Sequence, residues 1–263
     1  MISKNALCLL IYCFIGNLTF AQYSEVIRTG RPGQAITPFT PGKNVYQIQT
    51  GIETGKSGFR EENTKKLTYF SSNLFLRAGL TERLEINSTF DYRTENDRRI
   101  PSDSKESGLS RVNAGMRYLL KNMENQFPAI AVQYTVQLNT FRTASSEGDI
   151  SNTLLFGSSQ NLGKNTSLSL NAGIDYNFKS DNVQGLYVIN LGYSFTSKIS
   201  GFAEVYGNWN GASIKTYFNT GIGILVNENL LIYIFGGYGK KKKKKFFFGS
   251  AGLSYRFTHF RKL

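Results

Sequence analysis

Strict alternation of apolar and polar residues, repeated along nearly the whole chain, is the feature that most limits how this sequence can fold. In "PAIAVQYTVQLN", for example, Ile130, Val132 and Tyr134 alternate with Ala131 and Gln133. A β-strand sends successive side chains to opposite faces, so a segment of this kind has one apolar and one polar side. The alternation therefore predicts an all-β fold.

We count twelve such segments, an even number. They span residues 44–53, 67–80, 84–93, 109–120, 128–139, 150–161, 166–178, 185–196, 199–209, 214–226, 229–238 and 247–257. Their lengths suit tilted strands that cross a bilayer, for which about 9–11 residues suffice. No window contains 18 consecutive apolar residues, so no membrane-spanning helix is expected.

The connections between these segments alternate in length. Those after odd-numbered segments are mostly polar and several are long, such as "TENDRRIPSDSKESG", whereas those after even-numbered segments are mostly short, such as "TER" and "SK". Outer-membrane barrels combine long external loops with short periplasmic turns. A secreted β-sandwich or lipocalin-like barrel would alternate too, but it has no reason to sort its connections in this way. We therefore predict a transmembrane antiparallel β-barrel of about 12 strands.

The N-terminus has the composition of a secretory signal peptide. Lys4 precedes the apolar stretch "ALCLLIYCFIG", which is too short to span a membrane, and a cleavage point follows Ala21. Both cysteines, Cys8 and Cys13, lie in the segment to be removed. The mature chain is therefore expected to contain neither disulfides nor reactive thiols.

The expected organisation is a signal peptide (1–21), a periplasmic or lumenal segment (22–43), the barrel (44–257) and a short tail (258–263). The segment before the first strand contains three prolines and no alternation, so it is neither strand nor helix. It could fold into the lumen as a small plug, with Arg31, Pro32 and Gly33 as its ordered part, or it could be a loose periplasmic arm. The sequence leaves both alternatives open.

Positive charge is concentrated in one place. The formal net charge is +13, and six of these charges come from one run, so the rest of the chain carries 13 − 6 = +7. The run consists of Lys240, Lys241, Lys242, Lys243, Lys244 and Lys245. It falls in the last long connection, on the expected outer surface, where it would contact anionic lipopolysaccharide or form a solvated loop tip. A nucleic-acid partner is not expected.

The polar faces contain charged residues that would line the lumen. These are Glu53, Arg77, Glu85, Asp91, Arg93, Arg111, Arg117, Asp175, Glu204 and Arg256. They could form ion pairs that narrow a small lumen, or set ion selectivity in a wider one. The only histidine, His259, follows the last strand. No catalytic residue, metal site or cofactor is expected, so the protein is predicted not to be an enzyme.

Several stretches resemble a family of outer-membrane barrels that is named for the meta pathway of phenol degradation and often labelled "transporter". The opening "TGRPGQAITPFTPGKNVYQIQTGIE", the turn "GLTERLEI", the strand "SGFAEVYG" and the closing "AGLSYRF" carry this resemblance. It implies uptake of aromatic or other small hydrophobic compounds.

Two functional hypotheses follow for an integral protein of the outer membrane of a Gram-negative bacterium. The first is a barrel that passively admits small solutes through a lumen lined by polar residues. The second is a closed barrel with a structural or surface-interaction role, whose loops bind lipopolysaccharide or a partner. Both imply contact with outer-membrane lipid and insertion by the barrel-assembly machinery.

Overall fold

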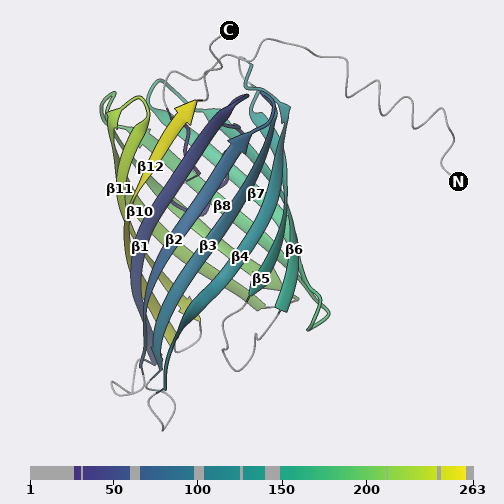
Figure 1. Cartoon of the computed structure of the whole chain (residues 1–263), viewed down its shortest axis with the longest axis vertical. Coiled ribbons are helices and arrows are strands. Elements are labelled where there is room, and N and C mark those ends of the chain that lie inside the picture. The colour runs from purple at the N-terminus through teal and green to yellow at the C-terminus, as the bar shows by residue number, and fades with distance from the viewer. Residues whose placement is uncertain are drawn as a thin grey trace, which may run out of the picture.

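Twelve antiparallel strands form one closed barrel in the computed structural model (Figure 1). The structure describes residues 27–30, 32–59, 66–97, 104–124, 127–139, 149–211, 213–241 and 244–258. The strands are β1 (Val45–Phe59), β2 (Lys66–Gly79), β3 (Leu84–Asp97), β4 (Ser104–Lys121), β5 (Ala129–Asn139), β6 (Asp149–Asn161), β7 (Thr166–Asn177), β8 (Asn182–Ser194), β9 (Ile199–Asn210), β10 (Ser213–Asn227), β11 (Leu230–Lys241) and β12 (Lys244–Thr258).

Each strand pairs with its neighbours in sequence, and β1 pairs with β12 to close the barrel. Closure leaves no free strand edge, so the backbone groups of the wall are satisfied within the protein. A membrane interior offers no water to satisfy them otherwise. No helix in the part of the chain that the structure describes is both long and apolar enough to cross a membrane.

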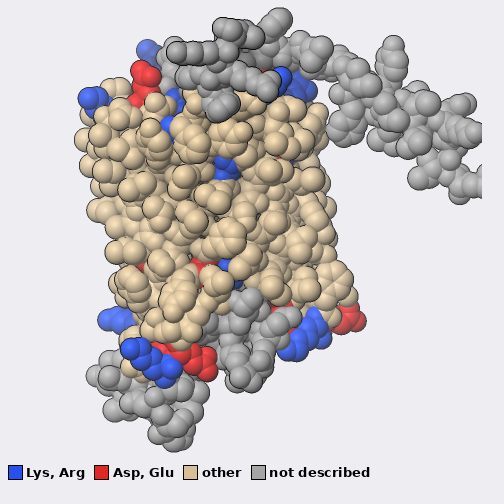
Figure 2. Space-filling view, viewed as in Figure 1, with Lys and Arg blue, Asp and Glu red and all other residues tan. Residues whose placement is uncertain are grey.

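Burial is inverted relative to a soluble protein. On β1, Gln47 and Gln49 are buried, whereas Ile48 and Ile52 on the opposite face are 37% and 52% exposed. The same contrast recurs around the barrel, and in the view of Figure 2 the charged side chains gather towards the two ends of a largely uncharged wall. The apolar faces therefore point outward to lipid and the polar faces point into the lumen.

The two ends of the barrel differ. We call the end with the connections 80–83, 122–128, 162–165, 195–198 and 228–229 the turn end, and the opposite end the loop end. The start of β1 and the end of β12 both lie at the turn end, at the top of Figure 1.

Several strands are longer than the alternation predicted. β1 continues to Phe59 instead of ending at position 53, β3 continues to Asp97 instead of 93, and β4 begins at Ser104 instead of 109. All three extensions lie at the loop end. They contain polar residues on both faces, because a strand that extends beyond the membrane has no lipid to select apolar side chains on its outer face.

Candidate functional site in the barrel lumen

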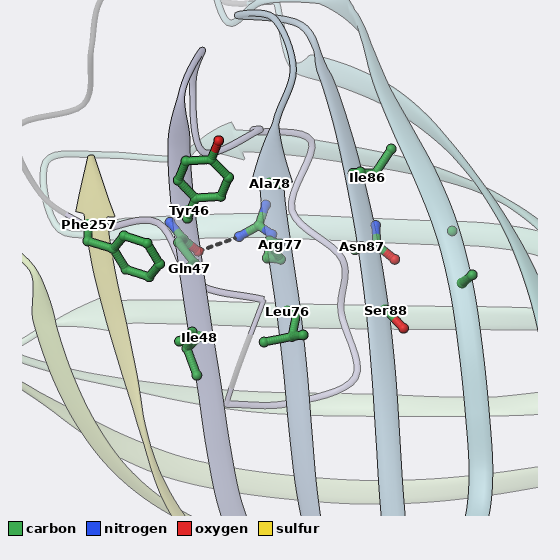
Figure 3. Close-up of a pocket in the computed structure, with 12 residues that line it drawn as sticks. Tyr46, Gln47, Ile48, Leu76, Arg77, Ala78, Ile86, Asn87, Ser88 and Phe257 are labelled. Atoms are coloured by element: carbon green, nitrogen blue, oxygen red, sulfur yellow. Dashed lines mark hydrogen bonds between the residues drawn. The ribbon is translucent and has the colours of Figure 1, made fainter. Parts of the chain in front are cut away.

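A loop, of which residues 28–30 and 32–39 are described, lies inside the turn-end half of the lumen. Arg77, which points inward from β2, closes this loop by donating to the carbonyl oxygen of Arg28 (2.8 Å) and to that of Phe39 (3.0 Å). The Arg28 guanidinium also lies 4.1 Å from the centroid of the Phe39 ring. The two ends of the loop are thus held together at one inward-facing arginine. Figure 3 shows the trace of the segment behind β1 and β2.

Glu204 and Asn171 hold the middle of the loop from β9 and β7. The Glu204 carboxylate accepts hydrogen bonds from the backbone N–H groups of Gln34 (2.8 Å) and Ala35 (2.9 Å). The Asn171 amide pairs with both backbone groups of Ile36, accepting from its N–H (2.8 Å) and donating to its carbonyl oxygen (3.0 Å). These contacts involve the backbone of the loop and not its side chains.

Arg117 on β4 donates to the carbonyl oxygen of Thr37 (2.9 Å). Glu85 on β3 lies between the two loop-binding arginines, 2.6 Å from Arg77 and 3.7 Å from Arg117. All three of these charged side chains are at most 1% exposed. A buried charge is stabilised only when it is paired and hydrogen-bonded, so Glu85 compensates both guanidinium groups and fixes their direction.

Amide side chains complete this ionic cluster. Gln47 accepts a hydrogen bond from Arg77 (2.9 Å), the dashed line in Figure 3, and Gln133 accepts two from Arg117 (2.9 and 2.7 Å). Asn87 donates to Glu85 (3.1 Å). We name Arg77, Glu85, Arg117, Asn171 and Glu204 the cradle. Four of them make seven hydrogen bonds to the backbone of the loop, and Glu85 pairs with the two arginines.

Two glycines allow the segment to approach the wall. Gly33 has φ +105°, a left-handed conformation, and a Cβ atom there would lie 3.1 Å from Glu204 and 3.2 Å from Phe202. At the end of β2, a Cβ atom on Gly79 would lie 1.8 Å from the carbonyl oxygen of Gly42. Gly79 therefore has no room for a side chain while the segment is seated, and at Gly33 a side chain would be strained by the positive φ and would crowd Glu204 and Phe202.

The remaining charged residues predicted to line the lumen also face inward, and they have partners elsewhere in the wall. Asp91 forms an ion pair with Arg111. Arg93 forms one with Glu95 (3.3 Å). Both pairs join neighbouring positions of the wall in the loop-end half of the lumen.

The other inward-facing charges are held by uncharged partners. Glu53 accepts from the Tyr69 hydroxyl (2.8 Å). Asp175 accepts from the Thr153 hydroxyl (2.7 Å) and from the Gln184 amide (3.0 Å). At the turn end, Arg256 donates to the Asn229 side chain (2.9 Å) and to the Glu228 carbonyl oxygen (3.2 Å). The predicted charges are therefore distributed over the whole lumen, and among them Arg77, Arg117 and Glu204 hydrogen-bond to the described backbone of the loop.

Sequence reasoning missed an aromatic surface inside the lumen. Phe202, Phe235, Phe248 and Phe246 form a chain of ring contacts with centroid separations of 6.4, 5.6 and 5.7 Å, and Tyr217 continues it at 6.2 Å. The strand registers place these rings on the same face as the cradle residues. The alternation that placed Glu204 inside also places Phe202 inside, so the signal was present in "SGFAEVYG". We name these five rings the aromatic stripe.

Parts of two sequence predictions lie outside the described residues. The expected signal peptide does, and so does Arg31, whereas Pro32 and Gly33 belong to the loop. Of the six lysines of the charged run, Lys242 and Lys243 lie outside too, and the side chains of Lys240, Lys241 and Lys244 are not described. Among the described residues, no group of three or more histidine, cysteine, aspartate and glutamate side chains could hold a metal ion.

A hollow of about 600 Å³ lies on the outer wall (Figure 3). Its outward-facing lining comes from the first four strands and β12, and includes Tyr46, Leu76, Ala78, Ile86 and Phe257. Small side chains between large ones create this hollow. The strands that form this hollow also contribute Gln47, Arg77 and Asn87 to its border, so its inner limit is the part of the wall that holds Arg77 of the cradle.

The closed wall, the outward apolar faces and the polar interior define a transmembrane β-barrel with an internally seated segment. The chain belongs to the family described as "Putative MetA-pathway of phenol degradation", whose model matches residues 29–257. The match therefore includes most of the seated loop as well as the barrel. No curated protein matches the sequence at a significant level.

Solved structures with the same fold are outer-membrane barrels. The COG4313 outer membrane channel from Pseudomonas putida F1 superposes with a TM-score of 0.66 and 13% identity, covering 86% of this chain and 99% of that one. The translocator domain of the autotransporter NalP from Neisseria meningitidis gives 0.54 and 14%, covering 82% and 89%. The NanC porin gives 0.54 and 10%, covering 78% and 98%. At these identities the similarity concerns the fold.

Proposed function

We propose that this protein is an outer-membrane channel that passively admits small solutes, and that residues 27–44 form a plug that must move before solutes pass. The observation that carries this proposal is the loop 28–39, which the cradle holds across the lumen through hydrogen bonds to its backbone. A segment that served only to brace the wall would not need to cross the lumen.

The barrel size is consistent with this function. Barrels of about eight strands are filled by their own side chains, whereas those of sixteen to eighteen leave an aqueous channel. Twelve strands give an intermediate lumen, which here accommodates a peptide loop. Withdrawal of the loop would leave a path lined by the cradle residues and by the aromatic stripe.

The description of the family and the aromatic stripe support aromatic or other small hydrophobic compounds as one class of solute. The solved structures of similar fold include channels and porins, which supports transport without catalysis and a location in the outer membrane of a Gram-negative bacterium. Export through the expected signal peptide and contact of the lysine run with lipopolysaccharide belong to the same proposal.

Single-channel conductance in a planar bilayer tests the proposal. We would compare the mature chain, from Gln22 to Leu263, with a version that lacks residues 22–43. We expect rare conductance steps in the first protein and frequent steps in the second. Absence of steps from both proteins would refute the channel and favour a closed barrel with a surface-interaction role.

A further inference from the structure

We propose that the cradle is a binding site for short peptides, and that residues 35–37 occupy it as an internal copy of such a ligand. This inference rests on the proposed channel function and adds a class of solute to it. It follows from the arrangement of charge across the lumen. The Glu204 carboxylate and the Arg117 guanidinium bind the two ends of this stretch from opposite parts of the wall, and Arg77 lies beside Arg117 across Glu85.

The β9 side of the cradle is suited to a peptide N-terminus. Glu204 accepts two backbone N–H groups of the seated loop, and an ammonium group presents the same kind of donor with a full positive charge. Asn190 donates to Glu204 (3.0 Å), and Asn219 pairs directly with Glu204 across β10 and β9. Asn219 is fully buried, yet its amide has no hydrogen-bond partner among the described residues. Its oxygen could therefore also accept from an ammonium group.

The opposite side of the cradle is suited to a C-terminal carboxylate. Arg117 donates to the carbonyl oxygen of Thr37, and Arg77 donates to two further carbonyl oxygens of the loop. When the loop withdraws, these donors lose their acceptors while the guanidinium groups keep their positions beside Glu85. Paired guanidinium groups bind carboxylates through short, charge-assisted hydrogen bonds.

Asn171 binds the peptide backbone at Ile36, between the residues that Glu204 and Arg117 bind. It accepts from the N–H of Ile36 and donates to the carbonyl oxygen of the same residue, as a neighbouring strand would. Three residues span at most about 10 Å when fully extended. The stretch from the N–H of Ala35 to the carbonyl oxygen of Thr37 is three residues long, so a tripeptide matches it and a single amino acid is too short to reach both Glu204 and Arg117.

Tracer exchange across proteoliposomes that contain the full mature chain tests this site. The labelled peptide is inside, and the same peptide is at equal concentration outside, so that no net charge moves. We would compare Ala-Ile-Thr with its N-acetyl and C-amide forms, which have nearly the same size but lack one charge each. We expect the free tripeptide to exchange about fivefold faster than either capped form, the ratio that one partly hydrated ion pair supplies.

The variant Glu204→Gln separates this role from plug release. If the substitution only loosens the loop, the exchange rates of all three peptides should rise together. If it removes the ammonium site, the free tripeptide should lose its advantage over the N-acetyl form and keep its advantage over the C-amide form. Glu124→Gln, which removes an exposed carboxylate in a turn, serves as the charge-matched control and should preserve that advantage.

The outcomes are distinct. Equal rates for the three peptides would overturn the peptide site and leave the channel intact, as would absence of peptide exchange in a protein that conducts ions. A preference for the free N-terminus that survives in Glu204→Gln would overturn the assignment of that residue. Absence of both ion conductance and exchange would instead refute the proposed channel.

Discussion

Asn171→Ala provides a quantitative test of how the loop is held. The Asn171 amide makes two hydrogen bonds to Ile36, at 2.8 and 3.0 Å, and alanine removes both. At about 1 kcal/mol for each bond, the substitution costs the seated state about 2 kcal/mol. The ratio of withdrawn to seated loop should therefore rise about 30-fold.

Single-channel recording measures this ratio as the time spent in the open state divided by the time spent in the closed state. Within the strands the Asn171 side chain makes one further hydrogen bond, to the adjacent Leu170 carbonyl oxygen (2.9 Å), and backbone pairing does not depend on it, so the heat stability of the folded barrel in detergent should change little. Asn113→Ala is a matched control, since Asn113 faces the lumen from β4 on the loop-end side of Arg117. An open fraction in Asn171→Ala that equals that of the wild type or of the control would refute the role of this residue in holding the plug.

Three further substitutions test the plug, the ionic cluster and the membrane orientation. Gly33→Ala should raise the open fraction, because it adds about 1–2 kcal/mol of left-handed backbone strain and a Cβ atom beside Glu204, whereas Gly163→Ala, in an open turn, should not. Glu85→Gln should lower the yield of folded barrel on heat-modifiability gels, because it leaves two buried guanidinium groups uncompensated at a cost of about 3–5 kcal/mol. A normal yield would contradict the compensating role of Glu85. Ile234→Arg, in the outward face of β11, should reduce folding in lipid vesicles by about 2–4 kcal/mol. Equal folding of this variant and the wild type would place this face away from lipid.

The alternation in the sequence predicted the barrel because a strand that crosses a membrane must satisfy two solvents at once. Ile48 faces lipid and Gln47 faces the lumen. Twelve repeats of this contrast are enough to count the strands. The loop-end extensions of β1, β3 and β4 were missed for the same reason. Beyond the membrane the contrast disappears, although backbone pairing continues.

The candidate site was predicted in part. Arg77, Glu85, Arg117 and Glu204 were expected inside as charged members of polar faces, but no sequence pattern distinguishes them from the other lumenal charges. Asn171 was missed because an uncharged amide on a polar strand face resembles many others. Its function depends on Ile36, which is 135 residues away in sequence.

By itself the sequence determined the topology of this protein, since each strand pairs with the next one along the chain and local alternation decides which face meets lipid. It left open whether residues 22–44 form a plug or a loose arm, because a proline-rich segment without periodicity contains no information about its partners. Only the tertiary structure places side chains from β2, β4, β7 and β9 around one loop. The physical reason is that closure of the barrel brings distant strands to face each other across the lumen, and the resulting distances depend on the closed shape as a whole.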